Sequence, residues 1–238
     1  MSNITIIVEA GINHNGNMDT AKELILRAKY AGADVWKTQI YDVAKMFPNK
    51  QVMAQGKNWY DKVLKTQLNK EHVLELSNYC KRLDIEFMAS AFDIERLGWL
   101  EEIGVKRHKL ATSVNKNRAI IEAMIATDKE ILYSCQSCLR PNVPQYPKMK
   151  FLYCIPKYPT SLKDLYLTNV DFGFAFQGFS DHTIGIEASM VAMSRGALII
   201  EKHFCLKRDN SNPDMICSIE PHELKELVSF ARKVEEIL

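Results

Sequence analysis

Two histidines with polar neighbours lie between residues 179 and 214. His182 stands in a Ser-Asp-His run, and His203 follows in a Glu-Lys-His run about twenty residues later. An apolar segment precedes each run and a helical pattern separates them, so we expect each histidine at the end of a strand. Parallel strands joined in this way would place the imidazoles side by side, as a catalytic divalent metal requires. Two unrelated histidines are the alternative, and the flanking Asp181, Glu201 and Asp214 favour the metal site.

The composition limits the class of protein. The chain has 238 residues, of which 47% are hydrophobic, enough for one domain over residues 1–238. Its 31 basic and 29 acidic residues leave a net charge of +2, which gives no reason to expect nucleic acid or a membrane surface as a partner. The sequence shows neither a signal peptide nor a long apolar run, so we expect a cytoplasmic protein. The six cysteines are best read as reduced thiols, the Cys135-Gln-Ser-Cys138 pair included.

Strand and helix patterns alternate along the sequence. Eight β-branched or apolar runs are expected as strands, at residues 4–8, 34–40, 86–92, 107–113, 130–134, 150–154, 174–179 and 197–200. Helices are expected at residues 19–31, 70–83, 93–103, 115–127, 161–167, 186–195 and 220–238. Three prolines between residues 141 and 147 predict that the helix after the fifth strand is degraded or missing. Residues 42–69 are too long for a plain connection and are predicted to form a lid or a rim insertion.

Eight strands alternating with helices predict a (β/α)8 TIM barrel. An open doubly wound sheet is the alternative, and no Gly-rich turn follows the first strand to support it. Active sites of such barrels lie where the carboxyl ends of the strands converge. Polar residues interrupt the apolar runs near those ends, at Glu9, Lys37, Ser90, Lys109, Thr112, Ser134, Ser180, His182, Glu201 and His203.

Several motifs in fixed order resemble the N-acetylneuraminate (sialic acid) synthase family. They are Val-Glu-Ala-Gly-Ile-Asn-His-Asn-Gly, Ala-Gly-Ala-Asp-Val-Trp-Lys-Thr-Gln, Phe-Ser-Asp-His-Thr-Ile-Gly-Ile-Glu-Ala, Glu-Lys-His-Phe and Ser-Ile-Glu-Pro-His-Glu-Leu. The resemblance extends from residue 4 to about residue 234. It implies a barrel that condenses phosphoenolpyruvate with an open-chain N-acylated amino sugar to give a nonulosonic acid. It also implies a homodimer and a divalent cation, Mn²⁺ first, with Mg²⁺ or Co²⁺ as alternatives.

The resemblance assigns roles to individual residues. It implies that His182 and His203 bind the metal. Phosphoenolpyruvate contacts fall on Lys37, Ser90, Lys109, Thr112 and Ser180; the family acids fall on Glu9, Glu201 and Asp214; and Tyr158 matches the family's Tyr-Pro-Thr. Ser134 joins the substrate-binding candidates as a strand-end hydroxyl. Asn13 is a further substrate-binding candidate, and His14 either reaches the acceptor sugar or stabilises a turn.

These residues suit the implied reaction. Lysines with nearby hydroxyl groups can bind the phosphate and carboxylate of phosphoenolpyruvate. A metal on the histidines would polarise the acceptor aldehyde. Either Glu9 or Asp214 could orient or deprotonate the attacking water, and Glu201 could neighbour the metal or accept from a sugar hydroxyl. Asp181 is a candidate for orienting a histidine.

The sequence departs from the family in three places. Pro156 replaces a polar substrate contact, and the Ser-Thr-Gly after the fifth strand becomes Tyr133-Ser134-Cys135. The third is an expectation: we expect the protein to lack the antifreeze-like domain that usually follows the barrel in this family. A separate antifreeze-like protein is therefore a possible partner. Two alternatives stay open: a related metal-dependent enzyme that forms a C–C bond with another acceptor, and a non-catalytic paralogue that binds ligand.

Overall fold

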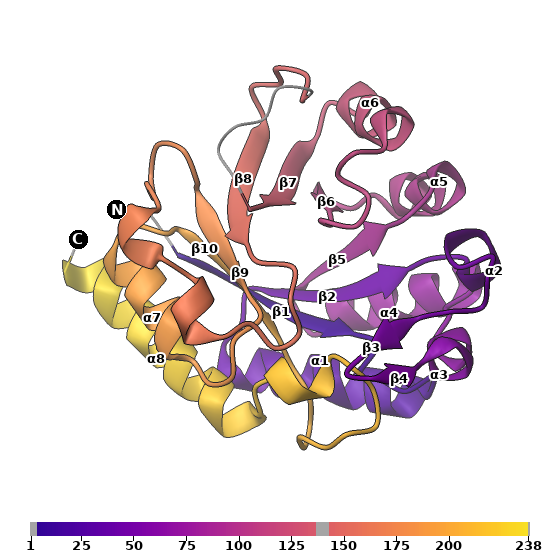
Figure 1. Cartoon of the computed structure of the whole chain (residues 1–238), viewed down its shortest axis with the longest axis horizontal. Helices are drawn as coiled ribbons and strands as arrows, with labels where there is room; N and C mark the ends of the chain where they lie inside the picture. Colours follow the sequence, from indigo (N-terminus) through magenta and orange to yellow (C-terminus); the bar gives the residue numbers. More distant parts are fainter. Residues whose placement is uncertain (1–3, 137–142, 238) are drawn as a thin grey trace.

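Eight parallel strands form a closed barrel in the computed structural model, which describes residues 4–136 and 143–237. The strands follow one another around the barrel in chain order, and the last pairs with the first (Figure 1). They are β1 (Thr5–Gly11), β2 (Val35–Ile40), β5 (Glu86–Ala91), β6 (Arg107–Leu110), β7 (Glu130–Cys135), β8 (Met149–Cys154), β9 (Gly178–Asp181) and β10 (Ile199–His203). The predicted (β/α)8 barrel is confirmed.

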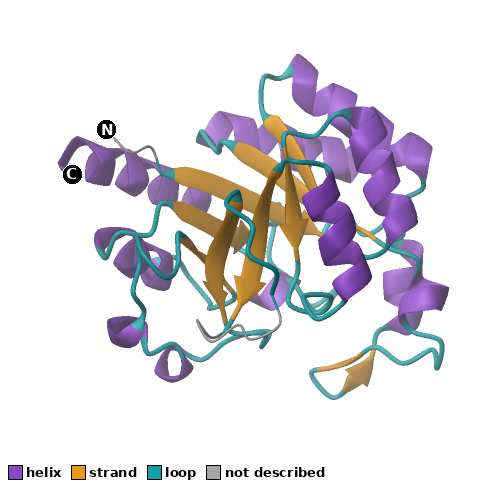
Figure 2. Cartoon of the chain, turned by 90° about the horizontal axis from the view of Figure 1, so that it is seen from above, coloured by secondary structure: helices purple, strands orange, loops and turns teal. Residues whose placement is uncertain are grey.

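Amphipathic helices surround the strands (Figure 2). They are α1 (Met18–Ala31), α4 (Lys70–Arg82), α5 (Ile94–Ile103), α6 (Arg118–Ala126), α7 (Glu187–Ser194) and α8 (Pro221–Ile237). Four begin at a side chain that accepts a hydrogen bond from the first turn: Asn17, Asn69, Asp93 and Asn117. Each such cap contributes about 1 kcal/mol to helix stability. No helix within the described ranges has the length and apolar character needed to cross a lipid bilayer.

Three predicted segments need correction or comment. Strand β9 begins at Gly178 rather than at residue 174, because residues 171–176 form a turn in which Gly173 has a φ of 99°. Residues 161–167 form no α-helix but two short 3₁₀ turns, Leu162–Asp164 and Leu167–Asn169. Between β7 and β8, the described residues 136 and 143–148 contain no helix, as predicted, while residues 137–142, Cys138 among them, lie outside the described residues.

The long connection after β2 has structure of its own. It contains α2 (Val43–Met46), a hairpin of β3 (Met53–Ala54) and β4 (Lys57–Asn58), and α3 (Tyr60–Lys65). A small core of Ile12, Tyr41, Val43 and Val63 fastens this insertion to the barrel. At the hairpin tip, Gln55 Nε2 donates to the carbonyl oxygens of Pro213 (3.1 Å) and Tyr158 (3.5 Å). The tip therefore reaches across to the loops that follow β8 and β10.

Strand alternation creates two layers of side chains inside the barrel. A buried apolar layer takes one residue from each of six strands: Ile7, Val35, Met88, Leu132, Leu152 and Ile199. Side chains two positions further along the same strands point to the same face. Those positions hold Glu9, Lys37, Ser90, Ser134, Cys154 and Glu201. The apolar layer thus forms the floor beneath a polar layer at the carboxyl ends of the strands.

Candidate active site

A cavity of about 310 Å³, including the space open to solvent at its mouth, lies above the apolar layer. It is lined by Glu9, Lys37, Gln39, Ser90, Lys109, Ala111, Thr112, Ser134, Cys154, Tyr158, Ser180, His182, Glu201 and His203. Eleven of these were predicted from the sequence, so the structure brings most of the expected residues together. Asn13, His14 and Asp214 are not among the lining residues.

Two lysines and two carboxylates form a connected network in this cavity. Lys37 Nζ lies 2.6 Å from Glu9 Oε2 and donates to Ser90 Oγ at 3.0 Å. Lys109 Nζ donates to Ser134 Oγ at 2.7 Å. Glu201 lies between the lysines: its Oε2 is 3.6 Å from Lys37 Nζ, and its Oε1 is 3.6 Å from Lys109 Nζ. All of these charged groups are buried, so their interactions are poorly screened by water.

The surroundings shift the pKa values of the network residues in different directions. Burial alone would raise the pKa of Glu201, but Lys109, Lys37 and a hydrogen bond from Ser180 lower it to about 2. Burial would lower the pKa of Lys37, yet Glu201 and Glu9 together raise it. At Lys109, the effect of burial is larger than the opposing effect of Glu201, so the pKa of Lys109 is lowered. Glu201 is therefore a permanent anion between two amines, and Lys37 is the more firmly charged of them.

The two histidines lie beside this network as predicted, with ring centroids 5.4 Å apart. His182 Nδ1 is 2.9 Å from the carbonyl oxygen of Ile155, so this nitrogen carries the proton and Nε2 keeps its lone pair. Burial lowers the pKa of His182 to about 4 and that of His203 well below its usual value. Both imidazoles are therefore neutral at pH 7. Tyr158 stacks on His182 with centroids 4.1 Å apart and meets His203 edge-on at 5.6 Å.

The histidine pair fits a metal in its chemistry. Neutral imidazoles are metal ligands, and His203 Nδ1 is buried without a hydrogen-bond partner in the described part of the chain. Within that part, no group of three or more His, Cys, Asp and Glu side chains converges as a metal cage. A bound cation would therefore take two protein ligands here, with water or substrate at the other positions.

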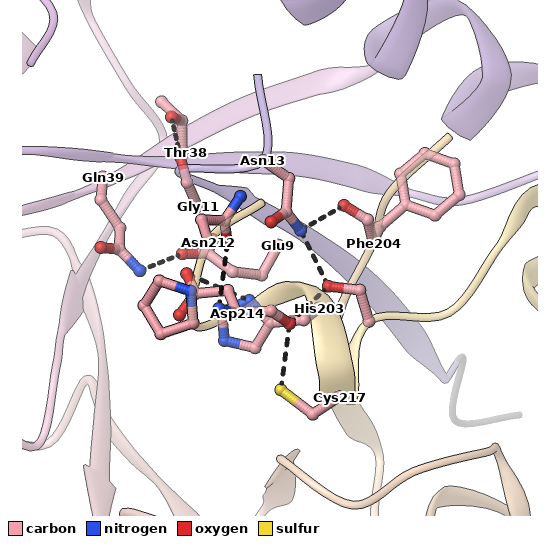
Figure 3. A network of polar contacts seen from close by, with 12 residues as sticks. Glu9, Gly11, Asn13, Thr38, Gln39, His203, Phe204, Asn212, Asp214 and Cys217 are labelled. Atoms are coloured by element: carbon pink, nitrogen blue, oxygen red, sulfur yellow. Dashed lines mark hydrogen bonds and ion pairs between the residues drawn. The ribbon is translucent and has the colours of Figure 1, made fainter. Parts of the chain in front are cut away.

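Asp214 approaches the site from the loop after β10 (Figure 3). Its Oδ2 lies 3.7 Å from His203 Nδ1, and a Cβ built on Gly11 would lie 2.9 Å from it. Burial and the charge of Glu9 raise its pKa to about 7, although a hydrogen bond from the Ile12 amide opposes the shift. The carboxyl group is thus packed against Gly11 at the edge of the cavity.

Asn13 and His14 shape the loop after β1 instead of lining the cavity. Asn13 Nδ2 donates to the carbonyl oxygen of Phe204 (2.9 Å) and to Ser218 Oγ (2.8 Å), which ties this loop to the segment after β10. His14 Nδ1 accepts a hydrogen bond from the Gly16 amide at 3.1 Å. Of the two roles expected for His14, turn stabilisation is the one its contacts support.

Three cavity residues, Gln39, Ala111 and Cys154, were missed from the sequence, although strand alternation could have found them. Ala111 lies two residues after Lys109. Gln39 lies two residues after Lys37, and its Nε2 donates to Glu9 Oε1 at 3.0 Å. Cys154 lies two residues after the interior Leu152, with its Sγ 3.9 Å from His182 Nδ1. Burial raises the pKa of this thiol to about 12, so it lines the wall as a neutral group.

Paired amines and carboxylates beside neutral histidines, at the carboxyl ends of barrel strands, are typical of the active site of a (β/α)8 enzyme. The chain belongs to the NeuB family, whose family model matches residues 24–238.

Several relatives are named as synthases of legionaminic acid, pseudaminic acid or N-acetylneuraminate 9-phosphate. The chain is 32% identical to N,N'-diacetyllegionaminic acid synthase of Legionella pneumophila, over 98% of this chain and 72% of that protein. It is 29% identical to pseudaminic acid synthase of Helicobacter pylori, over 96% of this chain and 73% of that one. Among solved structures, it is similar to N-acetylneuraminic acid synthetase from Leptospira borgpetersenii in complex with citrate. That similarity has a TM-score of 0.86 and 28% identity and covers 99% of this chain and 85% of the other.

Proposed function

We propose that this protein condenses phosphoenolpyruvate with the open-chain aldehyde of an N-acylated amino sugar, giving a nonulosonic acid and phosphate. The observation that carries the proposal is the placement of Lys37 and Lys109 on either side of Glu201, next to the neutral pair His182 and His203. Family membership and the synthase names of the relatives support the same reaction.

The amines provide the donor site. Phosphoenolpyruvate carries a phosphate and a carboxylate, and each anionic end needs buried cations and hydroxyl donors. Lys37 with Ser90, and Lys109 with Ser134, supply such a pair on neighbouring strands of the barrel. Ser180 Oγ donates a hydrogen bond to Glu201 Oε1 at 2.8 Å, and Thr112 also lines the cavity. Glu9 and Glu201 together balance the charges of the two lysines.

The acceptor lies between the donor and the mouth. His182 and His203 would hold a divalent cation, which when bound supplies Lewis-acid chemistry at the aldehyde oxygen. We expect Mn²⁺, with Mg²⁺ or Co²⁺ as substitutes. Gln39 and Tyr158 line the same region and can contact the sugar.

The reaction balances with one water molecule. The methylene carbon of phosphoenolpyruvate forms a bond to the aldehyde carbon, and the aldehyde oxygen takes up a proton. Water then adds to the former C2 of phosphoenolpyruvate and loses one proton. The C–O bond to phosphate breaks as the new C2 hydroxyl becomes a ketone, and its proton leaves with the phosphate. Asp214 is the better acceptor for the proton that water loses, because both oxygens of Glu9 are engaged by Lys37 and Gln39.

Phosphate release from phosphoenolpyruvate tests the proposal. The assay uses Mn²⁺ and a panel of N-acyl amino sugars that begins with N-acetylmannosamine. We compare the unmodified protein with His182→Asn and with the exposed-site control His222→Asn. Release should require sugar, metal and His182, and phosphoenolpyruvate labelled with ¹⁸O at its bridging oxygen should deliver the label to phosphate. A protein that binds no phosphoenolpyruvate would contradict the proposal, whereas binding without turnover would point to another acceptor.

A further inference from the structure

A buried ion pair lies behind the two histidines, on the outer face of the barrel strands. Lys202 Nζ is 3.1 Å from Asp181 Oδ2, and both side chains are completely buried. Strand alternation explains their direction: their neighbours Glu201 and Ser180 point into the barrel, so Lys202 and Asp181 point toward the helix layer. This pair therefore contacts no bound substrate.

The pair is part of a closed set of hydrogen bonds. Asp181 Oδ1 accepts from the amide and the hydroxyl of Thr183, both at 2.7 Å, and its Oδ2 accepts from Ser189 Oγ at 2.6 Å. Lys202 Nζ donates to the carbonyl oxygen of Thr183 at 2.6 Å. These contacts connect the ends of β9 and β10 to the turn between β9 and α7 and to α7 itself.

Each member of the pair directly precedes one of the histidines. In the strand register, Glu201 pairs with Ser180 and Lys202 pairs with Asp181. His182 and His203 are the next residues on the two strands. An ion pair at this position fixes where the strands end relative to each other, and so fixes the separation of the imidazoles.

The energetics also indicate a specific role. Removing two charges from water is costly, and apolar side chains of similar size often fill such a space at lower cost. Buried charges whose polar atoms all have hydrogen-bond or ion-pair partners nevertheless define one geometry more narrowly than apolar packing does. The wall of the barrel needs no charges at this point, since the cavity network lies on the other side of the strands.

We infer that Asp181 and Lys202 are positioning residues that hold His182 and His203 at the separation required to bind a divalent cation. The inference rests on the metal role proposed for the two histidines. It extends the sequence prediction for Asp181, which acts on its histidine through Thr183 and Lys202 rather than by touching an imidazole.

Single and double variants of Asp181 and Lys202 distinguish a positioning role of the ion pair from a contribution to stability. Asp181→Asn and Lys202→Met each leave one buried charge without its partner, so both single variants should have a lower Tm. The double variant Asp181→Asn/Lys202→Met removes both charges and should recover most of the lost Tm. Lys129→Met, which removes an ion pair with Glu101 at 2.8 Å on another part of the barrel, is the control.

Mn²⁺ affinity and the visible absorption spectrum of bound Co²⁺ are the readouts, and neither depends on turnover. We expect the double variant to bind Mn²⁺ about 10–100-fold more weakly than the unmodified protein and to give an altered Co²⁺ spectrum, although its Tm has recovered. The Lys129→Met control should keep both properties. Ser189→Ala, which removes a single hydrogen bond to Asp181, should give a smaller loss of affinity in the same direction.

Two outcomes would overturn different claims. A double variant with unchanged Mn²⁺ affinity and Co²⁺ spectrum would refute the positioning role and leave the proposed function intact. If the unmodified protein itself bound neither Mn²⁺ nor Co²⁺, the metal role of His182 and His203 would be wrong, and the positioning inference would fail with it.

Discussion

Gly11 and Asp214 approach each other so closely that there is no room for a side chain at residue 11. A Cβ there would lie 2.9 Å from Asp214 Oδ2, 3.3 Å from Gln39 Nε2 and 3.4 Å from Glu9 Oε1. Gly11 also has a φ of +51°, a conformation that an L-residue adopts only with strain. One backbone position thus sets the packing of three polar groups at the edge of the cavity.

Gly11→Ala should therefore impair activity more than stability. We expect kcat/KM to fall at least ~10-fold because Asp214 and Gln39 are displaced. The free energy of unfolding should fall by roughly 1–2 kcal/mol from backbone strain. Gly98→Ala, at an exposed position of helix α5 with no atom within 4 Å of its new Cβ, is the matched control and should be neutral or stabilising. Full activity in Gly11→Ala would show that this contact does not matter.

Lys37→Met should abolish phosphoenolpyruvate binding and also destabilise the protein. It leaves Glu9 buried without its cation and leaves Glu201 with Lys109 alone, and breaking a buried ion pair in this way costs about 3–5 kcal/mol. The double variant Lys37→Met/Glu9→Gln should recover part of that stability in urea unfolding, yet it should still fail to bind phosphoenolpyruvate by calorimetry. Binding restored in the double variant would argue against a donor-binding role for Lys37.

Mn²⁺ should stabilise the folded protein through the histidine pair. At 100 times its Kd, a ligand that binds only the folded state adds about 2.7 kcal/mol, which is measurable as a rise in Tm. The rise should disappear in His203→Asn and be reversed by a chelator in the unmodified protein. His222→Asn, at an exposed side chain, should keep it. A Tm that rises equally in all three proteins would place the metal elsewhere.

Acid should destabilise the protein partly through His14. Burial lowers its pKa from 6.5 to about 4, so between these values the unfolded chain binds a proton that the folded protein does not. Stability is therefore complete above pH 6.5 and declines as the pH falls toward 4, by at most about 3 kcal/mol from this residue. His14→Asn keeps an acceptor for the Gly16 amide and removes the titration. The unfolding free energy of this variant should fall less between pH 6.5 and 4, and an identical slope in both proteins would refute the assignment.

Strand alternation is the reason that so much of the site was predictable. Lys37, Lys109 and Glu201 interrupt apolar strands at alternating positions near the carboxyl ends, which predicts that their side chains point into the barrel. The correction at β9 has a local cause: phenylalanines at alternate positions in residues 172–176 resemble a strand, but Gly173 turns the chain there and leaves Phe174 88% exposed.

Other features depend on distances between segments far apart in sequence. The carboxyl group of Asp214 lies next to Gly11, although more than half of the sequence separates the two residues. No local sequence pattern indicates this contact. Lys202 resembles an ordinary strand-end lysine until the fold places it against Asp181. The homodimer and the antifreeze-like partner stay predictions.

The apolar layer that begins at Ile7 and ends at Ile199 makes the barrel a dead end rather than a tunnel. Lys37 lies just above that floor, Gln39 lies two residues closer to the mouth, and Gln55 reaches across the rim. The cavity has one entrance, so the ligand that binds at the lysines near the floor must bind before the ligand that occupies the mouth. Steady-state kinetics should consequently show ordered addition, with phosphoenolpyruvate first.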